Sequence, residues 1–148
     1  MKRNHKIIHV AIAIIINCEQ QILLARRQAH QSHSGKWEFP GGKVEPGETV
    51  EQALQREIKE ELALTVTASE PFCEITHHYE TETVILSVQQ VIAYDGQAIG
   101  NEGQLIQWYP IALLHTLTFP AANKEIIYQL QTRLVEIRNH DVRKHDSY

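Results

Sequence analysis

Residues 41–64 read GGKVEPGETVEQALQREIKEELAL, a glycine pair and a turn followed by a stretch with helical spacing. On a helix with about 100° per residue, its apolar residues form a single stripe, made of Val50, Ala53, Leu54 and Ile58. Glu57 and Glu61 fall inside the stripe, and Glu60 lies at its edge. A buried carboxylate is costly unless it is neutralised, paired or bound to a cation. The stretch therefore predicts a helix with an acidic site on its inner face.

The three glutamates have the spacing of metal ligands on one helix. Residues at i, i+3 and i+4 lie on neighbouring turns of the same face, where their carboxylates can converge. Oxygen ligands favour Mg²⁺ or Mn²⁺ over zinc, and Mg²⁺ is commonly held by carboxylates together with substrate phosphates. The alternative is a solvated acidic face paired with Arg56 or Lys59, and the helical pattern alone leaves both open. His30 and His33, on a polar loop, are interpreted as solvated side chains rather than ligands.

The segments around this helix alternate between strand and loop patterns. Residues 7–16 are β-branched on both faces, which is typical of a central strand, and we expect a hairpin with a strand at 21–27. Thr49 and Gln52 have the spacing of a capping box at the start of the helix. The later elements are strands at 63–68, 72–79, 83–94 and 104–109, then an amphipathic helix from Lys124 and a frayed tail at 139–148.

The composition is that of an ordinary globular chain, with 148 residues, 43% hydrophobic and 22% charged. This length suits one core, so we expect residues 1–148 to form a single domain and a monomer. The net charge of −4 does not favour stable nucleic-acid binding. Cys18 and Cys73 are isolated, which is typical of reduced thiols in a cytoplasmic protein. No run reaches the roughly 18 apolar residues of a membrane span, so we expect no membrane partner.

The acidic helix is also part of a longer pattern. Gly42, Glu48 and the run REIKEE at 56–61 have the spacing of the Nudix box, so the sequence resembles the Nudix hydrolase family. The resemblance is closest to the MutT-type members, the 8-oxo-dGTP diphosphatases, and extends to LARR at 24–27, WEFPGGK at 37–43 and FPAAN at 119–123. One departure is Ala63, where the family has Gly. A left-handed Ala at this helix exit would cost about 1 kcal/mol.

The resemblance implies an α/β (α+β) fold, an α/β/α sandwich with a central mixed β-sheet. It also implies a divalent cofactor, Mg²⁺ with Mn²⁺ as a possible substitute, bound by Glu57, Glu60, Glu61, Glu102 and the carbonyl of Gly41. Arg27 and Lys43 would bind the substrate phosphates, and Asn123 would read the purine edge with Phe39 nearby. For Asn123, the alternative that the residues alone favour is a cap on the following helix.

The implied reaction is metal-assisted hydrolysis of a nucleoside triphosphate to the monophosphate and pyrophosphate, which would clear 8-oxo-dGTP from the nucleotide pool and prevent mutation. A carboxylate must position or deprotonate the attacking water. Glu57, expected to lie deepest in the apolar stripe, is preferred, and Glu102 is the alternative. Glu48 is expected to support the junction of loop and helix, and Arg56 to orient neighbouring carboxylates. Two other functions stay open: an enzyme for pyrimidine or other nucleotides such as CTP, and a nucleotide-binding module without turnover.

Overall fold

The glutamate-rich stretch forms helix α1, Val50–Leu62, in the computed structural model, which describes residues 4–28 and 35–133. The hydroxyl of Thr49 accepts the backbone N–H of Gln52 at 3.1 Å, and the Gln52 side chain accepts the Thr49 N–H at 2.9 Å. These reciprocal bonds satisfy two donors that a helix start leaves without partners. The predicted helix and its capping box are confirmed.

The other end of α1 has the left-handed turn that the family pattern predicts. Ala63 has φ 59° and ψ 26°, and its N–H donates to the carbonyl of Lys59 at 3.1 Å. Backbone N–H groups of a distant loop donate to later carbonyls of the helix, that of Ile99 to Leu62 at 3.1 Å and that of Asn101 to Glu61 at 2.9 Å. These bonds offset part of the cost of a non-Gly residue at this position.

Two sheets organise the strands. The larger has the order β4-β1-β6-β5, with β4 at Gly41–Lys43, β1 at Lys6–Ile14, β6 at Glu82–Asp95 and β5 at Thr65–His78. β1 and β6 are parallel, and the other two pairings are antiparallel, so this sheet is mixed as the resemblance implied. The smaller sheet is antiparallel in the order β3-β2-β7, with β3 at Trp37–Glu38, β2 at Gln21–Arg26 and β7 at Ile106–Pro110.

The predicted hairpin between the first two strands is confirmed only at its turn, and the rest of the two strands does not pair. β1 pairs with β4 and β6, whereas β2 belongs to the other sheet. They meet only past the end of β1, where Ile16 and Ile22 form an isolated bridge and the N–H of Leu23 donates to Ile15 at 3.0 Å. The reason is that β1 is central, as its β-branched pattern indicated, and a strand with both edges occupied has none left for β2.

The strands predicted at 63–68 and 72–79 are one long strand, β5. Its register against β6 shifts near Ala68 and again between Pro71 and Cys73. β5 is an edge strand, where a proline without an N–H and β-bulges are tolerated. The residues that separated the two predicted strands therefore mark bulges within one strand.

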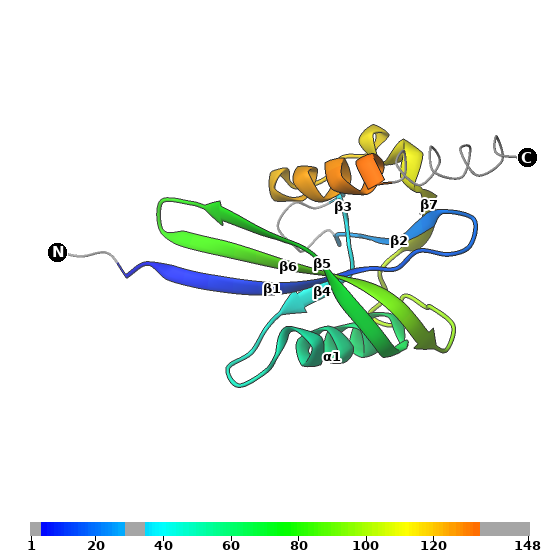
Figure 1. The fold of residues 1–148 in the computed structure, drawn as a ribbon, viewed down its shortest axis with the longest axis horizontal. Helices are drawn as coiled ribbons and strands as arrows, with labels where there is room; N and C mark the ends of the chain where they lie inside the picture. The colour runs from blue at the N-terminus through cyan, green and yellow to red at the C-terminus, as the bar shows by residue number, and fades with distance from the viewer. Residues whose placement is uncertain (1–3, 29–34, 134–148) are drawn as a thin grey trace, which may run out of the picture.

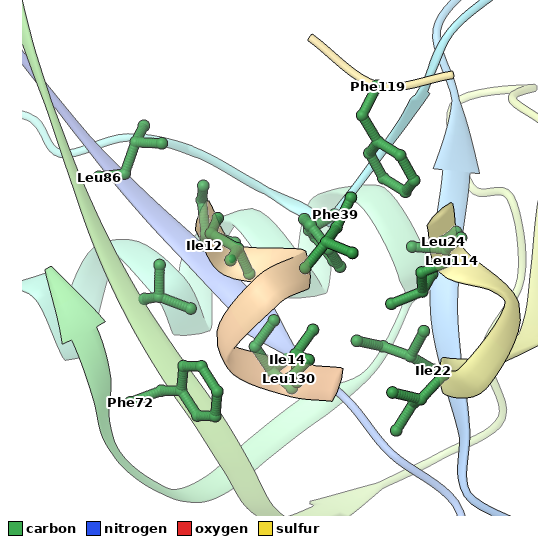
Figure 2. Packing of buried hydrophobic residues seen from close by; sticks show 14 residues of the cluster. Ile12, Ile14, Ile22, Leu24, Phe39, Phe72, Leu86, Leu114, Phe119 and Leu130 are labelled. Atoms are coloured by element: carbon green, nitrogen blue, oxygen red, sulfur yellow. The ribbon is translucent and has the colours of Figure 1, made fainter. Parts of the chain in front are cut away.

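Helical elements cover both faces of the larger sheet, which gives the α/β/α sandwich (Figure 1). On one face, the alternate side chains Ala11, Ala13 and Ile15 pack with Leu54 and Ile58 of α1. On the other, Ile12 and Ile14 pack with Leu114 of the 3₁₀ turn η1, Ile111–Thr116, and with Ile126 and Leu130 of the C-terminal helix (Figure 2). Burial on both faces holds for residues 11–15 alone, since Ile7 at the start of β1 is 70% exposed.

The C-terminal helix begins at residue 124 as predicted and is described to residue 133. It follows a short 3₁₀ turn, η2, at Ala121–Asn123. The predicted tail at 139–148 and the two histidines at positions 30 and 33 lie outside the described residues. Within the described ranges, no helix has the length and apolar character required to cross a membrane. Both cysteines are free thiols.

Candidate active site

A pair of glycines in β4 lies directly against the glutamates of α1. Gly41 and Gly42 pair with Ile12 and Ala11 of β1. A Cβ on Gly42 would lie 2.2 Å from the carboxyl carbon of Glu57, and a Cβ on Gly41, which has φ 156°, would lie 2.1 Å from the carbonyl oxygen of Ala11. Only glycine permits this approach without displacement, so the strand and the acidic face of α1 are in contact because of these two residues.

Arg56 fixes two of the acidic side chains. Its Nε and Nη2 each donate to Glu48 at 2.9 Å, Nη1 donates to Oε1 of Glu57 at 2.7 Å, and Nη2 also reaches the carbonyl of Lys43 at 3.0 Å. Glu48 accepts the N–H of Glu45 at 2.9 Å, which ties the loop to the helix. The bonds from Arg56 lower the pKa of Glu48 to about 2, so Glu48 is ionised at neutral pH. Arg56 therefore contacts the carboxylates that it was expected to orient.

Glu61 is the most buried carboxylate of α1, in contrast to the expectation that Glu57 lies deepest. Burial raises the pKa of Glu61 to about 8, with Glu57, Glu38 and Glu102 adding to the rise and the N–H of Gly41, 3.3 Å from Oε2, opposing it. Burial also raises the pKa of Glu57, and Arg56 opposes that shift. Both carboxylates lie against β4, Glu57 at Gly42 and Glu61 at Gly41, but only Glu57 also accepts a bond from the guanidinium of Arg56. Glu60, whose side chain is 57% exposed, faces outward.

Glu102 comes to the same place from a loop more than thirty residues beyond the helix. It is exposed, yet its charge raises the pKa of both Glu57 and Glu61. Together with Glu38 and Glu61 it lines a polar cavity of about 330 Å³. The structure thus brings the predicted loop carboxylate to the acidic face of α1.

Glu38 is a site residue that the sequence reasoning missed. It lies in β3, between two aromatic residues, and pairs with Arg27. Burial raises the pKa of Glu38, and Arg27 opposes the shift. Glu38 lines both the polar cavity and a second one, so it stands at their junction. Its partner Arg27 lies eleven residues earlier in the chain, so no local pattern in the sequence marked Glu38 as a site residue.

The second cavity, of about 270 Å³, contains the residues predicted to bind phosphate and base. Its polar side chains are Arg27, Glu38, Lys43 and Asn123, and its apolar wall includes Val10, Ile12, Phe39 and Leu86. The ring of Phe39 stacks on Phe119, with centroids 5.3 Å apart, and is 5% exposed, so it forms part of the core wall (Figure 2).

Asn123 projects into this second cavity from η2. Within the described part of the chain, its one side-chain hydrogen bond is a long contact of 3.5 Å to the carbonyl of Pro120. It makes no cap bond to the following helix among these residues. The role of Asn123 in base recognition stays a prediction.

The donor chemistry of the first cavity fits a hard divalent cation. The side chains at α1 and the facing loop are carboxylates, and neighbouring carboxylate charges add to the raised pKa of Glu57 and of Glu61, which is the situation that a bound cation relieves. Among residues 4–28 and 35–133, no three acidic, histidine or cysteine side chains are already arranged as a closed ligand set. The individual ligands therefore stay predictions.

Comparison with known proteins agrees with this geometry. The NUDIX domain family matches residues 11–129. The 8-oxo-dGTP diphosphatase of Escherichia coli strain K12 is 35% identical over 126 residues, covering 85% of this chain and 98% of that protein. The CTP pyrophosphohydrolase of the same strain is 36% identical over 109 residues, covering 68% of this chain and 81% of that protein. A solved structure from work on MutT of Aliivibrio salmonicida and Vibrio cholerae has a TM-score of 0.76 and 39% identity, covering 86% of this chain and 99% of that one. The chain belongs to the Nudix domain family.

Proposed function

We propose that the protein is a metal-dependent Nudix hydrolase that converts nucleoside triphosphates to the monophosphate and pyrophosphate, with 8-oxo-dGTP as its main substrate. The observation that supports this is the junction at Glu38 between a carboxylate cavity and a cavity with cationic, amide and apolar side chains. A nucleoside triphosphate has the complementary parts, because its phosphates need cations and its base needs an apolar wall with a polar contact.

At the carboxylate end, Glu57, Glu60, Glu61, Glu102 and the carbonyl of Gly41 would hold Mg²⁺, with Mn²⁺ as a substitute. The ion would polarise the phosphoryl oxygens and stabilise the departing pyrophosphate. Glu57 or Glu102 would position the attacking water and accept its proton. Arg56 supports this arrangement because its bond at 2.7 Å keeps Glu57 in one orientation.

At the cavity end, Arg27 and Lys43 would bind phosphate oxygens and Asn123 would contact the base edge. An amide donates and accepts at once, which suits a purine whose edge pattern changes on oxidation. The relative named 8-oxo-dGTP diphosphatase supports this choice of substrate. We also propose that the enzyme works in the cytoplasm, and that it is a monomer because one chain supplies the residues that line both cavities.

The relative named CTP pyrophosphohydrolase supports a second candidate, hydrolysis of pyrimidine triphosphates. Under this alternative Asn123 would not contact the base, and its one side-chain contact would be the long one to the carbonyl of Pro120. Under this alternative the carboxylate end is unchanged and the replacement of Asn123 by alanine has little effect on turnover.

The test is release of pyrophosphate from a panel of canonical and oxidised nucleotides in the presence of Mg²⁺. We expect the highest kcat/KM for 8-oxo-dGTP, loss of turnover with a chelator, and a loss of about 10²–10⁴-fold for Glu57→Gln. Glu51→Gln is the matched control, because it makes the same change on the first turn of α1, outside both cavities. A preference for CTP would support the second candidate. No turnover with any nucleotide would exclude both candidates, since each is a nucleoside triphosphate hydrolase.

A further inference from the structure

Gln104 joins the two segments that contribute carboxylates to the site. Its amide nitrogen donates to the backbone carbonyl of Glu61 at 2.9 Å, and its amide oxygen accepts the backbone N–H of Glu102 at 2.9 Å. One side chain thus uses both ends of its amide, one on the last turn of α1 and the other on the facing loop. We propose that Gln104 is a positioning residue that sets the place of Glu102 relative to the glutamates of α1; this rests on the proposed function.

The backbone of Glu102 depends on glutamine side chains for both of its polar groups. Besides the bond from its N–H to Gln104, its carbonyl accepts the amide of Gln28 at 3.0 Å. The Glu102 side chain itself is exposed, and within the described residues no hydrogen bond to its carboxylate holds it in place. The point from which this carboxylate extends toward the cavity is therefore set through the backbone.

The loop that carries Glu102 folds back on Gln104 at Gly100. A Cβ on Gly100 would lie 2.0 Å from the carbonyl oxygen of Gln104, and the N–H of Gly103 donates to Gly100 at 2.9 Å. Gln104 also lines the polar cavity beside Glu61 and Glu102. Gln104 can therefore have two effects: its bond to Glu102 positions that loop residue, and its bond to Glu61 stabilises the end of α1.

Asn101 separates these two effects. Its amide also donates to a carbonyl at the end of α1, that of Glu60, at 2.9 Å, but it makes no bond to Glu102. Asn101→Ala removes one bond to the helix end and leaves the Gln104 bridge intact. Gln104→Ala removes a similar bond and the bridge as well, so the two variants form a matched pair.

The first experiment measures ¹⁵N relaxation of the metal-free, nucleotide-free full chain by NMR. In the wild type and in Asn101→Ala we expect the amide order parameter of Glu102 to be near the rigid value of about 0.85, and in Gln104→Ala to fall below about 0.6. An unchanged Glu102 amide in Gln104→Ala would overturn the inference. This measurement needs neither turnover nor a bound ion.

The second experiment is a double-mutant cycle on kcat/KM with Mg²⁺. We expect Gln104→Ala to cost about 10–100-fold in the wild-type background, as loss of a supporting partner does, and to cost little in a Glu102→Gln background. Equal losses in both backgrounds would show that Gln104 only stabilises the helix end, and would overturn the inference. If the wild type hydrolyses no nucleotide, the proposed function fails, and the relaxation result alone then decides the role of Gln104.

Discussion

The two ends of the site differ in how firmly their polar side chains are held. At the carboxylate end, Glu48 and Glu57 accept short bonds from Arg56, and Glu61 accepts the N–H of Gly41. At the cavity end Arg27 pairs with Glu38, but the amide of Asn123 has a single contact of 3.5 Å and Lys43 is exposed.

This difference indicates where the site can change without losing its chemistry. Charged groups fixed before the substrate arrives are effective because they need no rearrangement during the reaction. A side chain with one long contact can be replaced or redirected at little cost to the fold. The carboxylate end therefore suits a reaction common to many nucleotides, and the cavity end suits a choice among them.

The largest expected effect is a loss of turnover in Gly42→Ala, which displaces a carboxylate at the carboxylate end. The new Cβ would lie 2.2–2.6 Å from the carboxyl atoms of Glu57, so that carboxylate must move. A displacement of about 1 Å at a reacting group can cost about 10²-fold, and we expect at least that loss in kcat/KM for every nucleotide. The contacted atoms end a flexible side chain, so the variant should fold, which circular dichroism would check.

Gly47→Ala is the control for this substitution. Gly47 has φ 84°, but a Cβ there would meet nothing within 4 Å. It should cost about 1 kcal/mol of stability through backbone strain, with turnover unchanged. Wild-type kcat/KM in Gly42→Ala would mean that the contact between β4 and Glu57 does not matter for the reaction.

At the cavity end we expect a smaller effect from Asn123→Ala, confined to selectivity between nucleotides. Loss of one hydrogen bond to the base costs about 1–2 kcal/mol, so the ratio of kcat/KM for 8-oxo-dGTP over dGTP should fall by about tenfold. Lys43→Ala should instead lower kcat/KM for both nucleotides alike, because phosphates do not differ between them. Measuring both variants on both nucleotides separates base recognition from phosphate binding. An unaltered ratio in Asn123→Ala would remove Asn123 from base recognition.

The sequence predicted best what depends on neighbours along the chain. Thr49 and Gln52 form a capping box within four residues, and the spacing of Glu57 and Glu61 needs only a helix. It was less informative where distant segments meet. A helical pattern gives the direction of a side chain but not its depth, so it could not show that Glu61, which accepts the N–H of Gly41 in β4, is the more buried of the two carboxylates.

Two site residues could not be predicted for the same reason, because their partners are distant in the sequence. Glu38 belongs to the site because Arg27, eleven residues earlier, pairs with it. Gln104 belongs to it because its amide meets a carbonyl 43 residues away. Neither residue has a local pattern that sets it apart from an ordinary polar side chain in a strand or loop.

The last expected effect is one on stability rather than turnover, and it concerns the carboxylate end itself. The pKa of Glu61 is raised from an ordinary value of 4.5 to about 8. Below pH 4.5, Glu61 is protonated in the folded and the unfolded chain alike. Between these two values the unfolded chain ionises while the folded chain keeps its proton, so stability falls as pH rises, and above about pH 8 the loss is complete.

Glu61→Gln removes this ionisation and keeps the shape of the side chain. In metal-free protein, its Tm relative to wild type should therefore rise between pH 4.5 and 8, by roughly 3 °C for each 1 kcal/mol of relieved destabilisation. Glu51→Gln, an exposed change on the same helix, should follow the wild-type curve. Added Mg²⁺ should reverse the order at pH 8, because an ion that binds the ionised carboxylate stabilises only the wild type. Parallel Tm curves for wild type and Glu61→Gln without the ion would show that burial does not raise the pKa of Glu61. The order of the carboxylate end would then depend on Arg56.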